Sequence, residues 1–174
     1  MKHKIINAVL FQALWFTAIL SGWLYALPLM VLHLAHFVYA ERHPKTRIAC
    51  FSLALLGMIG DSILGLFGVY HFHAENLMVL GVIPLWLCYM WLGFATCLPI
   101  SLSWLLRSPP LLLAFFSVGG TLSYLAGRSL GALAFESSVI PVIAGVWFII
   151  ACVVLLFQRV LQFKPSAEIQ LQGE

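Results

Sequence analysis

The sequence predicts an all-α membrane protein, a polytopic bundle of six transmembrane helices with both termini in the cytoplasm. Three observations predict this fold class. The first is composition, because 63% of the 174 residues are hydrophobic and 9% are charged. The second is a series of six apolar segments. The third is the distribution of lysine and arginine between the ends of those segments.

Composition also excludes several classes of protein. A soluble domain carries roughly 25% charged residues, so this chain has too few to cover a water-facing surface. Its nine basic and six acidic residues, with a net charge of +3, are too sparse for a nucleic-acid-binding face, and no nucleic acid partner is predicted. The four scattered cysteines make no disulfide framework and are expected to pack as small apolar side chains.

A helix needs ~20 mostly apolar residues to cross the hydrocarbon core. Six segments are predicted to cross it: 5–25, 27–40, 48–70, 77–99, 111–133 and 138–160. The second is short, and the fourth either continues through Trp104 or is bent or stopped by Pro99. A barrel is excluded because no segment alternates with a period of two. The six segments form one domain, 1–162, and residues 163–174 form a short polar cytoplasmic tail.

Basic residues set the predicted orientation. Eight of the nine precede the first segment, follow the second or fourth, or end the sixth: Lys2, Lys4, Arg42, Lys45, Arg47, Arg107, Arg159 and Lys164. Short cytoplasmic loops are enriched in lysine and arginine, so these ends are predicted to be cytoplasmic, with Arg128 as the exception. Asn7 and Gln12 favour a retained first helix over a signal peptide. An interfacial aromatic belt is expected near the segment ends, at Trp23, Tyr25, Tyr70 and Trp104.

Asp61 lies near the middle of the third segment. A carboxylate there costs about 2.5–3.5 kcal/mol on insertion scales, so it should face protein, water or a cation. At about 100° per residue it shares one helix face with Gly57, Gly65 and Gly68, which predicts a close-packed seam. Two interpretations stay open: a protonated or hydrogen-bonded aspartate that locks the bundle, or a proton-handling or catalytic carboxylate.

Two histidines of the second segment, His33 and His36, share one helix face. At ~1.5 Å per residue, His33 and Asp61 both lie roughly 20 Å from the cytoplasmic edge, so the two can meet. A hydrogen-bonded His–Asp pair, a site with two histidines and one carboxylate for a metal, and acid–base chemistry on a bound lipid are the alternatives.

The fifth segment carries small and polar residues along one stripe: Gly120, Ser123, Tyr124, Gly127 and Gly131. Glycines four apart favour close helix packing, so the third and fifth segments are expected to form a tightly packed interior pair. Arg128, at the edge of the stripe, either extends to the outer headgroups, with Glu136 as a partner, or turns inward toward Asp61 or a ligand's anionic head.

The connection His71-Phe72-His73-Ala74-Glu75-Asn76 is predicted to lie outside the cytoplasm. Its His-x-His-x-Glu pattern lacks a fourth ligand, so an ordinary polar loop is favoured over a metal site. No nucleotide-binding or hydrolase motif occurs in the chain. Neither a metal nor a cofactor is predicted.

The fourth segment is rich in aromatic residues. Helical spacing groups Trp86, Tyr89 or Met90, and Gly93 into a surface able to hold an acyl or isoprenoid chain. Trp91 lies in the same segment. The alternative is simple packing with interface anchoring.

Several of these residues form a pattern that resembles a known family. They are Asn7, Gln12 and Trp15-Phe16 in the first segment, Asp61 in the third, and Pro84-Leu85-Trp86, Trp91, Phe94-Ala95, Ser101-Leu102 and Trp104 in and after the fourth. They resemble domain of unknown function 2878, a family of small bacterial inner-membrane proteins. The resemblance implies a multi-pass protein of the bacterial inner membrane. Its members are often encoded beside enzymes that modify fatty acyl chains, which implies a role near membrane-lipid modification.

The leading hypothesis is an accessory protein or small enzyme of membrane-lipid modification, with membrane lipids and a lipid-modifying enzyme as partners. The alternatives are a small proton-linked transporter and a structural partner of another membrane protein, with self-association through the glycine stripes. Candidate catalytic residues are Asp61, His33 and His36. Candidate substrate-binding residues are Arg128, Tyr124, Trp86 and Trp91.

Overall fold

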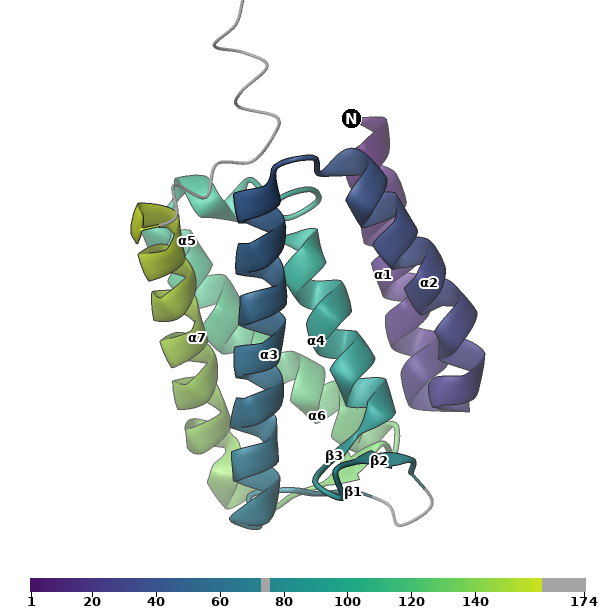
Figure 1. Ribbon diagram of the computed structural model, residues 1–174. Helices are drawn as coiled ribbons and strands as arrows, with labels where there is room; N and C mark the ends of the chain where they lie inside the picture. Colours follow the sequence, from purple (N-terminus) through teal and green to yellow (C-terminus); the bar gives the residue numbers. More distant parts are fainter. Residues whose placement is uncertain (73–75, 161–174) are drawn as a thin grey trace, which may run out of the picture.

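The computed structural model describes residues 1–72 and 76–160, which form an elongated helical bundle (Figure 1). The predicted tail, 163–174, lies outside the described residues. The helices are α1 (Lys2–Ser21), α2 (Trp23–Ala40), α3 (Pro44–Leu66), α4 (Leu85–Cys97), α5 (Pro109–Ala114), α6 (Thr121–Ser129) and α7 (Ile140–Val160). Short 3-10 helices, η1 (Leu105–Arg107) and η3 (Ser137–Val139), and a π-helix, η2 (Phe115–Gly120), lie between them.

The described residues confirm the predicted all-α fold, a bundle whose helices have the length and hydropathy of membrane spans. Five helical stretches are long and apolar enough to cross a bilayer, and α5, η2 and α6 join into one of them, Pro109–Ser129. The chain starts at the same end of the bundle at which α7 finishes (Figure 1). Which side of the membrane that end faces stays a prediction.

The fourth segment differs from its predicted extent. Helix α4 has 13 residues, and the stretch expected to begin it folds instead as a hairpin of β2 (Met78–Val79) and β3 (Ile83–Pro84). Gly81 closes this hairpin with a φ of 72° that favours glycine. The helix ends two residues before Pro99, as a proline without an N–H donor dictates, and turns lead from there to η1.

The fifth segment stops earlier than expected, at Ser129, and Gly131 then turns the chain with a φ of 80°. This turn leads into β4 (Leu133–Ala134), which pairs antiparallel with β1 (His71–Phe72). The pairing ties the connection after α3 to the connection after α6. Both two-stranded sheets lie at the end of the bundle opposite the N-terminus (Figure 1).

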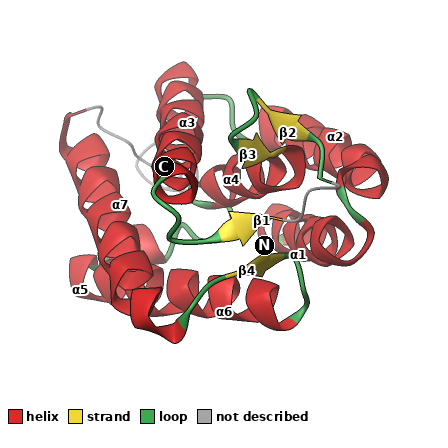
Figure 2. Cartoon of the chain, turned by 90° about the horizontal axis from the view of Figure 1, so that it is seen from below, coloured by secondary structure: helices red, strands yellow, loops and turns green. Residues whose placement is uncertain are grey.

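Helix α4 is the centre of the bundle. It packs against α1, α2 and α3, while α7 covers α5, η2 and α6 and touches α3 (Figure 2). The expectation that the third and fifth segments pack tightly together is therefore wrong: the main neighbour of α3 is α4. Of the α3 glycines, Gly57 faces the Trp91 side chain of α4, whereas Gly65 faces Phe72 and the Val82 carbonyl oxygen and Gly60 faces nothing within 4 Å.

Candidate functional site

Asp61 is buried in the interior of the bundle, with 2% of its surface exposed. Three side chains donate hydrogen bonds to its carboxyl group. The Tyr70 hydroxyl donates to Oδ1 at 2.5 Å, while the Trp91 indole N–H and the Tyr124 hydroxyl donate to Oδ2 at 2.6 and 2.5 Å. Because both oxygens have donors, the burial cost of the carboxyl group is offset within the protein.

The three donors reach Asp61 from three different elements. Tyr70 follows the end of α3, where Gly68 adopts a φ of 71° and reverses the chain toward its own helix. Trp91 comes from α4 and Tyr124 from α6. A single carboxyl group therefore holds together segments that are remote in sequence.

Tyr70 was expected in an interfacial belt, and this expectation is wrong. Its side chain is fully buried, and burial raises the pKa of its phenol, which the neighbouring Asp61 carboxyl raises further. The phenol therefore stays protonated and able to donate. In contrast, Tyr25 and Trp104 are 69% and 46% exposed, as a belt requires.

Two glycines leave the space that two aromatic rings occupy beside Asp61 and its three donors. A Cβ on Gly57 would lie 2.2 Å from the Trp91 ring, and one on Gly120 would lie 2.1 Å from the Trp147 ring. The two indoles stack on each other, with centroids 5.1 Å apart and planes 19° from parallel. Glycine is therefore required at both positions for the stacked pair to fit.

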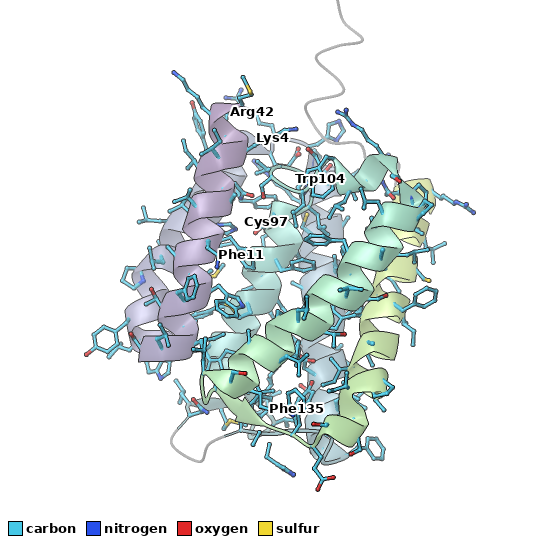
Figure 3. All side chains as sticks on the ribbon, turned by 180° about the vertical axis from the view of Figure 1, so that it is seen from behind. Lys4, Phe11, Arg42, Cys97, Trp104 and Phe135 are labelled. Atoms are coloured by element: carbon cyan, nitrogen blue, oxygen red, sulfur yellow. The ribbon has the colours of Figure 1, made fainter. Side chains whose placement is uncertain are left out.

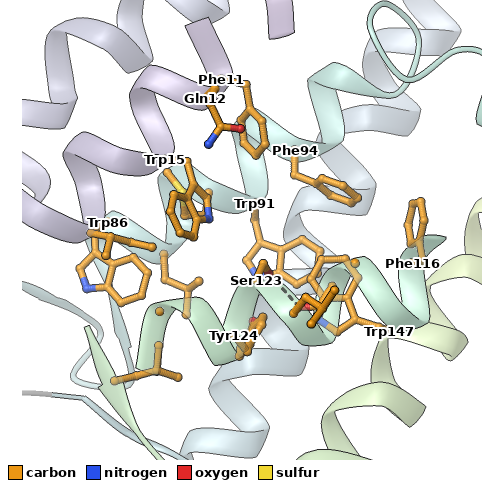
Figure 4. A pocket seen from close by; sticks show the side chains of 18 of the residues that line it. Phe11, Gln12, Trp15, Trp86, Trp91, Phe94, Phe116, Ser123, Tyr124 and Trp147 are labelled. Carbon is orange, nitrogen blue, oxygen red and sulfur yellow. Dashed lines mark hydrogen bonds between the residues drawn. The ribbon is translucent and has the colours of Figure 1, made fainter. Parts of the chain in front are cut away.

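A cavity of about 470 Å³ lies beside the cluster, between α1, α4, η2, α6 and α7 (Figure 4). Its volume falls within the ~300–1,000 Å³ that small-molecule sites occupy. Nine of its 19 lining residues are aromatic: Phe11, Trp15, Trp86, Trp91, Phe94, Phe115, Phe116, Tyr124 and Trp147. The same Trp91 and Tyr124 whose polar atoms bind Asp61 turn their rings to the cavity, so the carboxyl group fixes part of its wall.

Few polar side chains line the cavity. Gln12 stands at its edge on α1, and the Ser123 hydroxyl donates to the Gly120 carbonyl 2.8 Å away (Figure 4). Asp61 is not among the lining residues. The neighbouring π-helix η2 supplies part of the wall, and π-helical turns often occur at functional sites. The chemistry of the cavity is that of a binding site for an apolar group.

His33 and Asp61 bind different partners, although their depths were expected to bring them together. The His33 Nε2 lies 2.9 Å from the Thr96 hydroxyl and 3.2 Å from the Gly93 carbonyl oxygen, both on α4. The His33 ring is fully buried, and its Nδ1 has no hydrogen-bond partner. The hypothesis of a His33–Asp61 pair is therefore wrong.

We expect His33 and Thr96 to couple energetically. A double-mutant cycle with His33→Ala and Thr96→Ala should give a coupling free energy of about 0.5–1.5 kcal/mol in unfolding, because each residue loses the other's hydrogen bond. The control cycle pairs His33→Ala with Ser101→Ala, whose hydroxyl donates to Asn7 Oδ1 instead. If the changes in unfolding free energy were additive in the His33–Thr96 cycle as well as in the control cycle, the hydrogen bond between His33 and Thr96 would be contradicted.

His36 lies nearer the N-terminal end, half-buried, with its Nε2 3.3 Å from Nδ1 of the exposed His3. It does not join Asp61. Within residues 1–72 and 76–160, no group of three histidine, cysteine, aspartate or glutamate side chains could hold a metal ion. His73 and Glu75 lie outside the described residues.

Arg128 points to the loop that follows α6. Its guanidinium donates to the Phe135 carbonyl oxygen at 3.2 Å, lies 3.5 Å from the Ser137 hydroxyl and sits 4.8 Å from the centre of the Phe135 ring. These contacts place it neither on Glu136 nor on Asp61. Its binding role stays a prediction, as do the catalytic roles of Asp61, His33 and His36.

The sequence pattern brought forward Trp86, Trp91 and Tyr124, and the structure places all three on the cavity wall. It missed Tyr70 and Trp147. For Tyr70 the missed signal was Gly68, because a glycine just past a helix end often reverses the chain. Trp147 carried no comparable signal: its place depends on α7 packing against Gly120.

Comparison with protein-family models identifies the chain. Residues 4–155 match the family described as "Protein of unknown function (DUF2878)". The chain belongs to this family, which confirms the resemblance noted from its residues. A comparison with curated proteins found no match, and a comparison with solved structures found none.

Proposed function

We propose that this member of the DUF2878 family binds the apolar chain of a membrane lipid in its aromatic cavity, as an accessory protein in fatty acyl modification. The observation that carries the proposal is the cavity of about 470 Å³, whose wall is almost entirely aromatic and aliphatic. Aromatic and aliphatic side chains offer contact area to an acyl or isoprenoid chain without requiring a polar group in it.

Binding is favoured over catalysis by the position of the reactive groups. The oxygens of Asp61 already accept three hydrogen bonds, and the carboxyl group lies behind Trp91 and Tyr124. His33 lies behind Phe11, with the ring centroids 6.1 Å apart, and its Nε2 is bound to α4. A general acid or base must reach the reacting group within hydrogen-bond distance, and these two residues do not face the cavity.

We further propose that the protein lies in the bacterial inner membrane, with the N-terminal end of its bundle facing the cytoplasm. The positions of basic residues support this orientation. Lys4 and Arg42, both predicted to be cytoplasmic, stand at one end of the bundle (Figure 3). Arg128, the predicted exception, lies against Phe135, which stands at the other end. Lysine and arginine are enriched in cytoplasmic loops.

Tryptophan fluorescence tests chain binding, because four tryptophans line the cavity and bromine quenches indole emission at short range. A monoacylglycerol with a dibrominated chain, added to purified protein in detergent, should quench the tryptophan emission, and this quenching should saturate as the probe concentration rises. It should exceed the quenching caused by probe that is merely dissolved in the detergent micelle. Gly119→Leu should weaken this binding at least about tenfold. A Cβ on Gly119 meets the Phe115 ring at 3.9 Å and nothing nearer, so the Cβ fits without a clash. Gly119 lines the cavity, and the rest of a leucine side chain there would take up part of its volume.

The matched control is Gly145→Leu, at an exposed position of α7 where a Cβ meets nothing within 4 Å. It should leave the quenching unchanged. Equal quenching in the two variants and the unaltered protein would overturn the proposed site. A deletion strain should also show altered acyl chains in its lipids, and an unchanged lipid profile would overturn the role in acyl modification.

A further inference from the structure

A second cavity of about 370 Å³ adjoins the aromatic one. Its wall combines the end of α1, the start of α2 and the turn after α6: Ala18, Ile19, Ser21, Gly22, Trp23, Leu24, Asn76, Trp86, Gly131 and Ala132. Ile19 and Trp86 line both cavities. The two spaces therefore meet at these side chains.

The cavities differ in chemistry and in position. The second one has polar side chains in its wall, those of Ser21 and Asn76, and lies at the end of the bundle that carries the strands. From Trp86 the aromatic cavity runs along α4 as far as Phe94. The eight helical steps from Trp86 to Phe94 span about 12 Å. A chain lying along α4 thus has an apolar path that ends in a polar chamber.

Three helix ends, two C-termini and one N-terminus, meet at this polar chamber. Helix α1 ends at Ser21, and the helical stretch Pro109–Ser129 ends just before Gly131. Ser21 and Gly131 both line the chamber. The last turn of a helix presents carbonyl oxygens and the negative end of its dipole. Helix α2 begins at Trp23, and its first residues, Trp23 and Leu24, bring backbone N–H donors to the same wall. The chamber therefore offers both acceptors and donors of hydrogen bonds, and none of its lining residues is a lysine or arginine that could pair with an anionic group.

We infer that the two cavities form one site for a single-chain amphiphile, with its head in the polar chamber and its chain along α4. The head is a neutral group that both donates and accepts hydrogen bonds, as a glycerol hydroxyl does, and is not a carboxylate or phosphate. This inference rests on the proposed function and adds the direction and head chemistry of the ligand.

Two brominated monoacylglycerols test the direction, one with bromines near the ester and one with bromines near the terminal methyl. Trp86 lines both cavities and Trp23 lines the chamber, so both indoles border the head. Trp86→Phe should therefore remove about a third or more of the saturable quenching by the first probe, with Trp23 contributing to the remainder, and little of the quenching by the second. The control is Trp104→Phe, because Trp104 lines neither cavity. It should change the quenching by both probes equally.

A third probe, the fatty acid with the same brominated chain, tests the head at a pH where its carboxyl group is ionised. It should bind about tenfold more weakly than the monoacylglycerol, because no lysine or arginine is among the residues that line the chamber and its charge would be buried without a partner. Quenching by both monoacylglycerols with no dependence on Trp86, or with the opposite dependence, would overturn the direction, and equal binding of the acid would overturn the head chemistry. In each case chain binding would stand, whereas absence of saturable quenching by every probe would overturn the proposed function itself.

Discussion

Asp61→Ala should lower the free energy of unfolding by about 3–9 kcal/mol, because three buried donors lose their acceptor and each costs about 1–3 kcal/mol. Folded proteins are usually stable by about 5–15 kcal/mol, so this loss would be a large fraction of the total stability. Asp61→Asn should cost about 1–2 kcal/mol. Its amide oxygen still accepts from Trp91 and Tyr124, and the Tyr70 hydroxyl can turn to accept from the amide nitrogen. Unfolding of the protein in mixed micelles, titrated with SDS, measures both changes.

The control for Asp61 is the next residue on the same helix. Ser62 donates to the Met58 carbonyl oxygen within α3, so Ser62→Ala should change the unfolding free energy by less than about 0.5 kcal/mol. Similar stability of Asp61→Ala and Ser62→Ala would show that the three bonds to the carboxyl group contribute little. Destabilisation by Asp61→Asn as large as that by Asp61→Ala would contradict the acceptor role assigned to it.

Gly57→Ala should have the second large effect, a loss of about 2–4 kcal/mol in unfolding free energy. The new methyl group would occupy the position of the Trp91 ring, 2.2 Å from its nearest atom. Trp91 must then move, which costs packing against Trp147 and its bond to Asp61. The change in tryptophan emission on unfolding, followed in the same titration, reports both the stability and the altered indole environment.

Gly60→Ala is the matched control on α3. A Cβ at Gly60 meets nothing within 4 Å, so this variant should gain about 0.5–1 kcal/mol from the better helix propensity of alanine. The combination of Gly57→Ala with Asp61→Ala should cost less than the sum of the two, since both disrupt the same Trp91 contact. Full additivity would mean that the glycine seat and the carboxyl group act independently.

The sequence predicted the fold class well because membrane crossing depends on local composition. Segment length and charge distribution need no knowledge of tertiary contacts, and the helices α1, α2, α3 and α7 overlap the expected segments. The fourth segment was overestimated because its first residues are apolar yet form the β2–β3 hairpin. Hydropathy reports that a residue avoids water and does not report whether protein or lipid surrounds it.

The candidate site was predicted less completely. Asp61 was expected in an interior seam, and its burial agrees with that expectation. Its partners were not foreseen, because depth along the membrane leaves the angular position of each helix undetermined. His33 lies at a depth similar to that of Asp61, yet α4 provides its partners. Matching depth is therefore necessary for a contact between helices but does not determine it.

The brevity of α4 bears on how the protein enters the membrane. Its 13 residues span about 20 Å, well short of the ~30 Å hydrocarbon core. The irregular turns beyond it contain Leu98, Ile100 and Leu105, all nearly inaccessible, so surrounding helices shield this backbone from lipid. Such a segment is a poor substrate for insertion by itself. Integration of α4 should therefore follow that of its neighbours, which makes it a late step in the biogenesis of the bundle.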